Sequence, residues 1–422
     1  MNGLSRGIHV RLLVMMFLQY AVWGTWFMTL GGYVGKYLGF AGWQIGWLYA
    51  LLPLANIVVP FTGGQIADRW LPTQVALGIF HLAGAAVCFV LAYVKSYPAM
   101  MTWLAVYCLL YAPTLALTNS LAFRNLRDPQ REFGIIRVGG TIGWIAAGWL
   151  LTLLRRVWGT ESPQYVDFFL LGGVLSALLG VYCFTLPPTP PAKEGRDPLA
   201  FREALVLFKD RSYLVFFIIA FVVATELQLY YVLTFPYLEI ITPVIGLKSS
   251  SLPAVMTVAQ VAEIVTMTLL LPWAMPKWGV RKCMLVGMIA WPIRYIIFAA
   301  TYPLYKEMPV MVWLTIGSLV LHGFCYVFFF VVAFIYTDMV APKDIRASAQ
   351  ALINVAVLGI GLFVGSKFAG WLSDLCTDAA SKTVNYGMVF AVPAVITVIC
   401  AVVFAILFHG PQTTASTERT NT

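Results

Sequence analysis

Apolar runs long enough to cross a membrane recur along this chain from Val10 to Phe408, and they restrict its possible folds more than any other feature. The hydrocarbon core of a bilayer is about 30 Å thick, which a helix of about 20 apolar residues spans. Of the 422 residues, 60% are hydrophobic and 11% are charged, whereas soluble domains are about one-quarter charged. The sequence therefore predicts an integral membrane protein with no room for a soluble catalytic domain.

Charged residues and Pro- or Gly-rich breaks divide the apolar runs into twelve predicted spans. These are roughly 10–35, 43–67, 73–95, 97–122, 133–154, 166–187, 212–237, 251–274, 279–301, 308–337, 345–372 and 385–408. The first run continues to about Tyr33 without an A-x-A cleavage site, so we interpret it as a span and not as a secretion signal. The predicted fold class is an all-α membrane protein with twelve transmembrane helices.

The longest polar stretch, from Pro187 to Arg211, separates the first six spans from the last six. It contains a run of prolines, which cannot continue a helix. We therefore expect an N-terminal six-helix bundle at 1–187, a cytoplasmic linker at 188–211, a C-terminal six-helix bundle at 212–408 and a cytoplasmic tail at 409–422. Two such halves with a binding site between them, near mid-membrane, are a common plan of transporters.

The distribution of Lys and Arg predicts the orientation of the chain. Seventeen of the 27 basic residues lie at the N-terminus, in even-numbered loops or in the tail, against eight at the odd-numbered loops. The positive-inside rule therefore places both termini in the cytoplasm. The same bias explains the net charge of +9, and no basic stretch is interleaved with exposed aromatic residues, so no nucleic-acid partner is predicted.

Cysteine and histidine spacing gives no sign of a metal or cofactor site. The seven cysteines include no C-x-x-C pair, and the four histidines include no H-x-x-x-H pair. A membrane-embedded enzyme would need a convergent acid/base or metal cluster. We therefore predict neither an enzyme, a metal nor a cofactor.

Glu263 is the main candidate for a functional residue. It lies near the middle of the apolar stretch Pro253–Trp273, where an acid costs roughly 3 kcal/mol even on lenient insertion scales. Gln260 lies three residues earlier on the same helical face, so the two side chains suggest a polar cavity. The rival interpretation is a buried strut between Glu263 and Arg294 of the next span.

Two other spans carry polar residues at helical spacing. Arg137, Thr141 and Trp144 follow each other at i, i+4 and i+7 and form one stripe, although Arg137 could instead extend to the cytoplasmic surface. Gln228 and Tyr231 are i, i+3 neighbours, and we favour both for the cavity. Glu226 points to another face of the same helix, and we expect it to make a structural hydrogen bond.

Aromatic residues follow one face of the tenth predicted span. His322, Tyr326, Phe329 and Phe330 form an aromatic wall at helical spacing, for which plain core packing is the alternative. In the first span, Gln19, Trp23, Thr25 and Trp26 face either a cavity or a neighbouring helix.

The loop GGQIADRWLP, between the second and third spans, contains Gly64, Asp68 and Arg69. The corresponding loop between spans eight and nine reads PKWGVRK. The two resemble complementary parts of the G-x-x-x-D-R-x-G-R-K loop of the major facilitator superfamily. The resemblance implies a structural and gating role for Gly64, Asp68 and Arg69.

Longer strings carry a more specific resemblance. YAPTLALTNSLAF, IIRVGGTIGWIAAG, LHGFCY, IRASAQALI and the Gln260–Glu263 pair resemble the nucleoside:proton symporters of the major facilitator superfamily. The resemblance covers nearly the whole chain. It implies two six-helix bundles, alternating access, a nucleoside carried inward with protons, a bacterial inner membrane and a monomer.

The resemblance also implies roles for single residues. Arg137, Thr141, Gln228, Gln260 and Glu263 fall where family members contact nucleoside or couple protons, and we expect Glu263 to be the proton-responsive group. Trp144 is positioned to stack on the base. The expected substrate-binding residues are Arg137, Thr141, Trp144, Gln228, Tyr231, Gln260, Glu263, Tyr326 and Phe330.

The chain departs from the family in the tenth span. Members commonly carry an acid there in a Y/F-D-F motif, whereas this chain reads Tyr326-Val327-Phe328. Phe330 replaces a polar residue of relatives, and Tyr231 replaces a smaller polar residue of some members. These changes leave open a transporter of another small polar solute, such as a sugar, or a facilitator without proton coupling.

Overall fold

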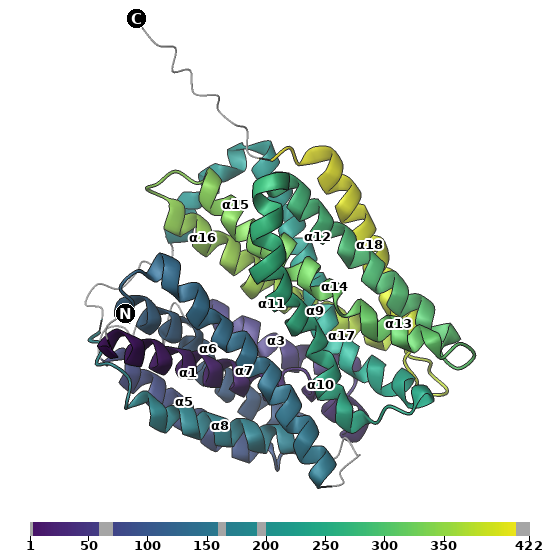
Figure 1. Ribbon diagram of the computed structural model, residues 1–422. Coiled ribbons are helices and arrows are strands. Elements are labelled where there is room, and N and C mark those ends of the chain that lie inside the picture. The colour runs from purple at the N-terminus through teal and green to yellow at the C-terminus, as the bar shows by residue number, and fades with distance from the viewer. Residues whose placement is uncertain (1–2, 59–70, 159–165, 192–199, 411–422) are drawn as a thin grey trace, which may run out of the picture.

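The computed structural model describes residues 3–58, 71–158, 166–191 and 200–410, and it is almost entirely helical (Figure 1). Within this part of the chain, nine helical stretches are long and apolar enough to cross a membrane. One of them, Ser249–Leu304, holds two consecutive spans, and the 17-residue helices α3 and α8 supply two more. The all-α membrane fold with twelve spans is thereby confirmed.

The first half of the chain contributes six spans. They are α1 (Gly3–Trp26) with its continuation α2 (Leu30–Gly32) and η1 (Tyr33–Tyr37), α3 (Gly42–Val58), α5 (Thr73–Leu91), α6 (Tyr97–Asn125), α7 (Pro129–Val157) and α8 (Asp167–Cys183). The ends of α6 and α7 extend beyond the predicted 97–122 and 133–154, because polar residues continue the helix outside an apolar run. Gly64, Asp68 and Arg69 lie outside the described residues.

The second half contributes the other six spans. They are α9 (Arg211–Ile241); α10 (Leu252–Met256) with α11 (Val258–Val265), η6 (Thr266–Leu270) and the start of α12 (Leu271–Leu304); the rest of α12; α13 (Val310–Ser318) with α14 (Leu321–Gly323), η7 (Phe324–Val331) and α15 (Val332–Val340); α16 (Arg346–Asn354) with η8 (Val355–Gly361) and α17 (Leu362–Leu375); and α18 (Tyr386–Leu407). A short helix, η3 (Ala200–Lys209), precedes them and packs on α16.

Gly279 separates the eighth span from the ninth. Its φ of 68° lies in the left-handed region, which glycine adopts without the steric cost that a side chain imposes. This is the glycine of the PKWGVRK loop, so the predicted turn between these spans is present at the expected residue.

The helices form two groups that follow the two halves of the sequence (Figure 1). In the first half α1 packs along α7 and α8, and α5 packs along α6 and α8. In the second half α12 packs along α18, and α9 packs along α17. A transmembrane helix gains little from the hydrophobic effect against lipid, so close packing and interhelical hydrogen bonds hold such groups together.

A buried hydrogen-bond network joins four helices of the first half. Gln19 Nε2 on α1 donates to Thr114 Oγ1 on α6 at 2.7 Å, and Gln19 Oε1 lies 2.7 Å from Nε2 of His81 on α5. The other ring nitrogen of His81 lies 3.1 Å from Ser176 Oγ on α8. Gln19 therefore bonds neighbouring helices, which is one of the two alternatives that its sequence position allowed.

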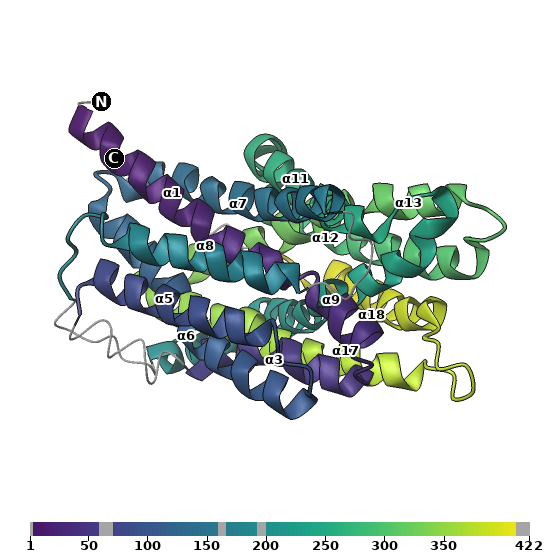
Figure 2. The ribbon, with the colours of Figure 1, turned by 90° about the horizontal axis from the view of Figure 1, so that it is seen from below.

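The two halves contact each other at the end of the molecule opposite to the N-terminus, which we call the closed end. There α3 and α17 lie side by side (Figure 2), and α7 packs on α10. The Ala254 N–H donates to Thr152 Oγ1 at 3.1 Å, and Arg156 Nη2 donates to Ser251 Oγ at 3.1 Å. Each of these bonds joins one half of the protein to the other.

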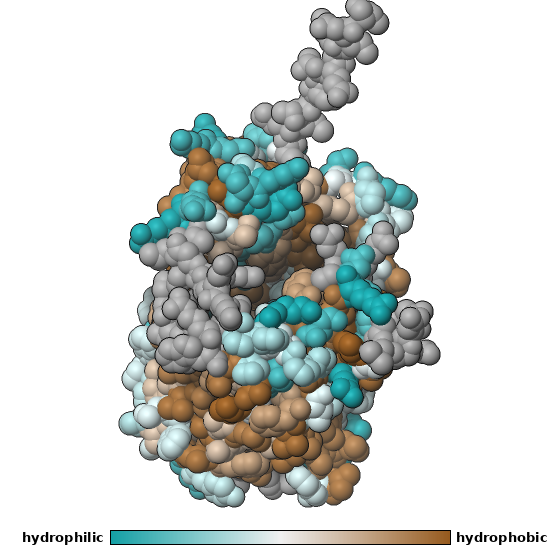
Figure 3. Space-filling view, turned by 90° about the vertical axis from the view of Figure 1, so that its left-hand side faces the viewer, coloured by the Kyte–Doolittle hydropathy of each residue, from teal (hydrophilic) through white to brown (hydrophobic). Residues whose placement is uncertain are grey.

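The contact between α3 and α17 depends on glycine. A Cβ atom on Gly42 would lie 2.5 Å from the carbonyl oxygen of Gly370, so a side chain at this position would separate the two helices. On the face that carries the N-terminus, by contrast, the surface is hollowed between the two halves (Figure 3). The molecule is therefore closed at one end and hollow at the other.

Candidate functional site

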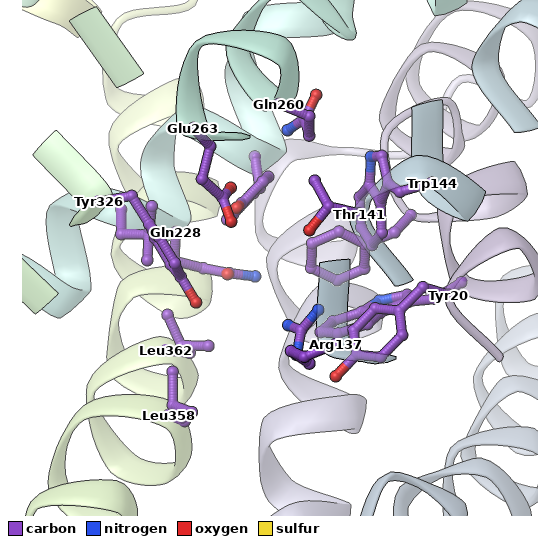
Figure 4. Close-up of a pocket in the computed structure, with 14 residues that line it drawn as sticks. Tyr20, Arg137, Thr141, Trp144, Gln228, Gln260, Glu263, Tyr326, Leu358 and Leu362 are labelled. Carbon is purple, nitrogen blue, oxygen red and sulfur yellow. The ribbon is translucent and has the colours of Figure 1, made fainter. Parts of the chain in front are cut away.

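A cavity lies between the two halves of the protein (Figure 4). The space inside it that a water-sized sphere can occupy is about 100 Å³. Helices α1 and α7 line it from the first half, and α9, α11, η7, η8 and α17 line it from the second. The lining residues are Tyr20, Trp23, Phe27, Arg137, Thr141, Trp144, Leu227, Gln228, Tyr231, Gln260, Glu263, Tyr326, Leu358 and Leu362.

Eight of the nine expected substrate-binding residues line this cavity. They are Arg137, Thr141, Trp144, Gln228, Tyr231, Gln260, Glu263 and Tyr326. The ninth, Phe330, is not among the lining residues; it is buried behind Tyr326, at 6.0 Å between ring centroids, and edge-on to Trp291 at 6.4 Å. Helical spacing and the family resemblance predicted Phe330 in the wall, but the structure places it in the core of the second half.

Glu263 faces the cavity and is 9% exposed. Among the described residues it forms no ion pair with Arg294, so the predicted alternative of a Glu263–Arg294 strut is wrong. Arg294 Nη1 instead donates to His322 Nδ1 at 3.1 Å. Its guanidinium lies over the ring of Tyr230 at 4.4 Å and over that of Trp291 at 4.6 Å.

Arg137 is the cationic residue of the cavity wall. Its guanidinium carbon lies 4.1 Å from the centroid of the Tyr20 ring, and Figure 4 shows the two side chains lying against each other. Arg137 therefore does not extend to the cytoplasmic surface. It also acts electrostatically on Glu263 from the opposite half, without the direct contact of a salt bridge within the described residues.

Aromatic rings form much of the rest of the wall. Trp144 is edge-on to Trp23 at 5.2 Å and to Phe27 at 6.2 Å. Phe27 also meets Tyr231 edge-on at 5.4 Å, and because these two residues belong to different halves, their contact joins the halves beside the cavity. Such rings offer flat faces on which a planar ligand can stack.

Several polar atoms of the lining residues are buried and have no hydrogen-bond partner. Buried polar groups in proteins are normally paired, so unpaired ones on a cavity wall mark positions where a ligand or water binds. They include donors and acceptors, and both atoms of the Gln228 amide are among them. These atoms are Trp23 Nε1, Trp144 Nε1, Gln228 Oε1, Gln228 Nε2 and Gln260 Oε1.

The sequence did not single out five of the lining residues: Tyr20, Phe27, Leu227, Leu358 and Leu362. Tyr20 and Trp23 on α1, and Phe27 directly after its end, are spaced i, i+3 and i+7, so an aromatic stripe was present in the sequence. The same stripe is expected of a helix face that packs on its neighbours. The leucines carry no polar group that could distinguish a cavity wall from a core.

Among the described residues no group of three or more His, Cys, Asp or Glu side chains could hold a metal ion. The seven cysteines are all buried and free, each in or at the end of an apolar helix. The chemistry of the cavity is therefore that of two charges, two amides, hydroxyl groups and aromatic rings.

Comparisons with known proteins agree with this arrangement. A family model described as "Nucleoside H+ symporter" matches residues 6–413. The chain is 36% identical over 408 residues to the "Putative nucleoside transporter YegT" of Escherichia coli (strain K12), covering 94% of this chain and 93% of that protein. It is 33% identical to the xanthosine permease of the same organism, covering 91% and 92% of the two chains. The crystal structure of the nucleoside transporter NupG superposes with a TM-score of 0.83 at 27% identity, covering 97% of this chain and 100% of that one.

Proposed function

The protein belongs to the nucleoside H⁺ symporter family, and we propose that its cavity carries a nucleoside inward together with a proton. Membership makes it a secondary active transporter with the major facilitator fold, and not an enzyme. The residues that bind the solute and the proton are our proposal. It is supported by one observation above all: Arg137 of the first half and the Gln260–Glu263 pair of the second line the same cavity.

The cavity offers complementary groups for both parts of a nucleoside. A ribose presents hydroxyl groups, which can donate to Glu263 and exchange hydrogen bonds with Gln260 and Gln228. A nucleobase is planar and aromatic, and Trp144 presents an indole ring in the same wall. Because Gln260 and Glu263 belong to one half and Trp144 to the other, a solute bound in this way contacts both halves.

Glu263 is the residue that we propose to take up the proton. Other buried titratable groups are engaged elsewhere. His322 Nδ1 can only accept from Arg294, since a guanidinium donates and never accepts. His81 is bonded within the first half to Gln19 and Ser176.

Glu226, the other buried acid of this region, does not line the cavity. It is 1% exposed, and its side chain accepts from Thr225 Oγ1 at 3.5 Å. Glu263, by contrast, lies at the cavity surface and interacts electrostatically with Arg137. Protonation removes the charge of Glu263 and with it the electrostatic attraction to Arg137 across the cavity. Where this attraction is stronger in one conformation than in the other, proton binding and solute binding are coupled.

We further propose that the closed end faces outward and that the hollow face is cytoplasmic. The positive-inside rule supports this orientation, because it assigns the N-terminus to the cytoplasm. On this view the structure is an inward-facing conformation, and transport opens the α3–α17 and α7–α10 contacts. The bacterial inner membrane and a monomeric state complete the proposal.

The experiment is uptake of labelled uridine and adenosine into proteoliposomes with an imposed pH gradient. We expect accumulation in the native protein and none in Glu263→Gln, which keeps the shape of the side chain but removes its titration. Exchange of labelled for unlabelled nucleoside, which needs no gradient, should persist in this variant. Glu226→Gln is the matched control, and it should still accumulate nucleoside. Gradient-driven accumulation by Glu263→Gln would disprove the role of Glu263.

A facilitator without proton coupling is the second candidate. The observation that favours it is that Glu263 is the one carboxylate among the described lining residues. Such a protein would equilibrate nucleoside across the membrane at a rate unaffected by a protonophore. A panel of nucleosides and sugars, tested with and without the protonophore, separates the two candidates and also identifies the solute.

A further inference from the structure

In the cavity wall, the aromatic ring of Tyr20 lies against the guanidinium of Arg137. The Arg137 guanidinium carbon lies 4.1 Å from the centroid of the Tyr20 ring, well within the roughly 6 Å of a cation–π contact. Tyr20 belongs to α1 and Arg137 to α7, two helices that pack along each other. Within the described residues, Arg137 forms no hydrogen bond or ion pair, so its N–H donors are available to a ligand.

Gly140 provides the space for this contact. It follows Arg137 by three residues, which places it on the same face of α7. A Cβ atom on Gly140 would lie 2.6 Å from Cδ2 of Tyr20 and 3.1 Å from Nη1 of Arg137. The ring and the guanidinium therefore occupy one slot, and a side chain at Gly140 would push either of them out.

The alternative position of the guanidinium is at the membrane surface. Arg137 lies about two turns from the start of α7, and a long basic side chain in a membrane helix extends toward water when nothing holds it. Ordering such a side chain also costs rotamer entropy. The aromatic face compensates for part of this cost, because its quadrupole attracts the cation while leaving the N–H groups unbonded.

We propose that Tyr20 is a positioning residue for Arg137: its ring holds the guanidinium at the cavity wall, opposite Glu263, where the N–H groups can bind the solute. The proposal rests on the proposed function for the part that concerns solute binding. Its structural part, the position of the guanidinium, is independent of what the solute is.

The binding test compares Tyr20→Leu with Tyr20→Phe by equilibrium binding of labelled uridine. Leucine removes the aromatic face, and we expect a roughly 10-fold higher Kd. Phenylalanine keeps the face and loses the hydroxyl, and it should restore most of the lost affinity. Gly140→Ala should raise the Kd as Tyr20→Leu does, since it disturbs the same slot. If Tyr20→Phe binds as weakly as Tyr20→Leu, the ring is not what matters and the proposal fails.

Tyr20 also lines the cavity, so a direct contact with the solute must be distinguished from an effect through Arg137. A double-mutant cycle makes the distinction. In an Arg137→Gln background, we expect Tyr20→Leu to change the Kd by less than 2-fold. A second 10-fold loss in this background would show a direct contact and overturn the positioning role.

A structure of the Tyr20→Leu variant without solute gives the decisive readout. We expect the guanidinium of Arg137 to have moved out of the slot toward the N-terminal end of α7. A guanidinium that keeps its position would overturn the proposal, even if Tyr20→Leu binds nucleoside poorly. If the native protein binds no nucleoside, the proposed function fails while this structural test remains valid.

Discussion

Asp374, in the last turn of α17, accepts a hydrogen bond from the backbone N–H of Gly42 at 2.6 Å and so joins the two halves of the protein. Its second carboxylate oxygen accepts from the N–H of Trp43 at 2.7 Å. These N–H groups lie in the first turn of α3, where they have no partner within the helix, and the helix dipole there favours an anion. Asp374 therefore stabilises the closed end.

Asp374→Ala should shift the protein toward a conformation in which the closed end is open. Loss of a helix cap costs about 1 kcal/mol, which corresponds to a roughly 5-fold change in the equilibrium. Spin labels at Tyr93 and Met308, which are 79% and 48% exposed in the loops α5–α6 and α12–α13, report the separation of the halves. We expect a larger population at long distance in the variant.

Asp378 provides the control for Asp374. It lies in the next loop and accepts from the Ser381 N–H at 2.6 Å, so its bonds stay within one half. The backbone N–H of Ser381 lowers the pKa of Asp378 further below its ordinary value, which is already acidic. Asp378→Ala therefore removes an equal charge and should leave the distance distribution unchanged. An equal shift in both variants would mean that charge, and not the cap on α3, controls the opening.

Trp144→Ala should weaken nucleoside binding if the indole stacks on the base. Stacking of a base on an aromatic side chain contributes roughly 1–3 kcal/mol, so we expect the KM for uridine to rise at least 5-fold. Trp144→Phe keeps an aromatic face and should lose less. A KM for Trp144→Ala equal to that of the native protein would place the base elsewhere in the cavity.

Gln19→Leu should destabilise the first half without a matching effect on the KM. The substitution removes the partners of His81 and Thr114 and leaves buried polar groups unpaired, at a cost of roughly 2 kcal/mol. Thr25→Val is the control on the same helix, because the Thr25 hydroxyl bonds only its own helix, at Val22 O. Thermal unfolding in detergent should show a lower Tm for Gln19→Leu than for Thr25→Val.

Arg294→Lys should destabilise the second half more than Arg294→Met. Arg294 is fully buried, rests on aromatic rings and donates to His322. Methionine fills much of the space without a charge, whereas a lysine ammonium is more strongly hydrated and fits the rings less well. The measurement is again the Tm. If Arg294→Lys is tolerated and Arg294→Met is not, the charge itself is needed in this position.

Sequence periodicity predicted those parts of the site that lie on regular α-helix. Arg137, Thr141 and Trp144 share a face because they are spaced i, i+4 and i+7, and Gln260 and Glu263 share another because they are spaced i, i+3. The length of the apolar runs was likewise sufficient to predict twelve spans. Neither inference required knowledge of which helices are neighbours.

Periodicity failed where the helix is not a regular α-helix, and where the contacts of a residue depend on which helix packs beside it. Phe330 follows Tyr326 by four residues, but both lie in η7, a π-helical segment whose i→i+5 hydrogen bonds widen the turn and rotate later residues away. The partner of Arg294 depends on how α12 turns against η7 and α14, which no local pattern contains. Tyr20 was missed because an aromatic residue beside an arginine of another helix has no signature in the sequence.

The π-helical segments are unevenly distributed along the chain. Of the four π-helical segments among the described residues, three (η6, η7 and η8) belong to the second half, whereas in the first half Gln19 and His81 bind four helices together. π-helical turns are rare in proteins and are frequently found at functional sites. The two halves therefore contribute differently to the cavity: irregular helix lies mainly in the half that carries Gln260 and Glu263, and the four-helix hydrogen-bond network lies in the half that carries Arg137.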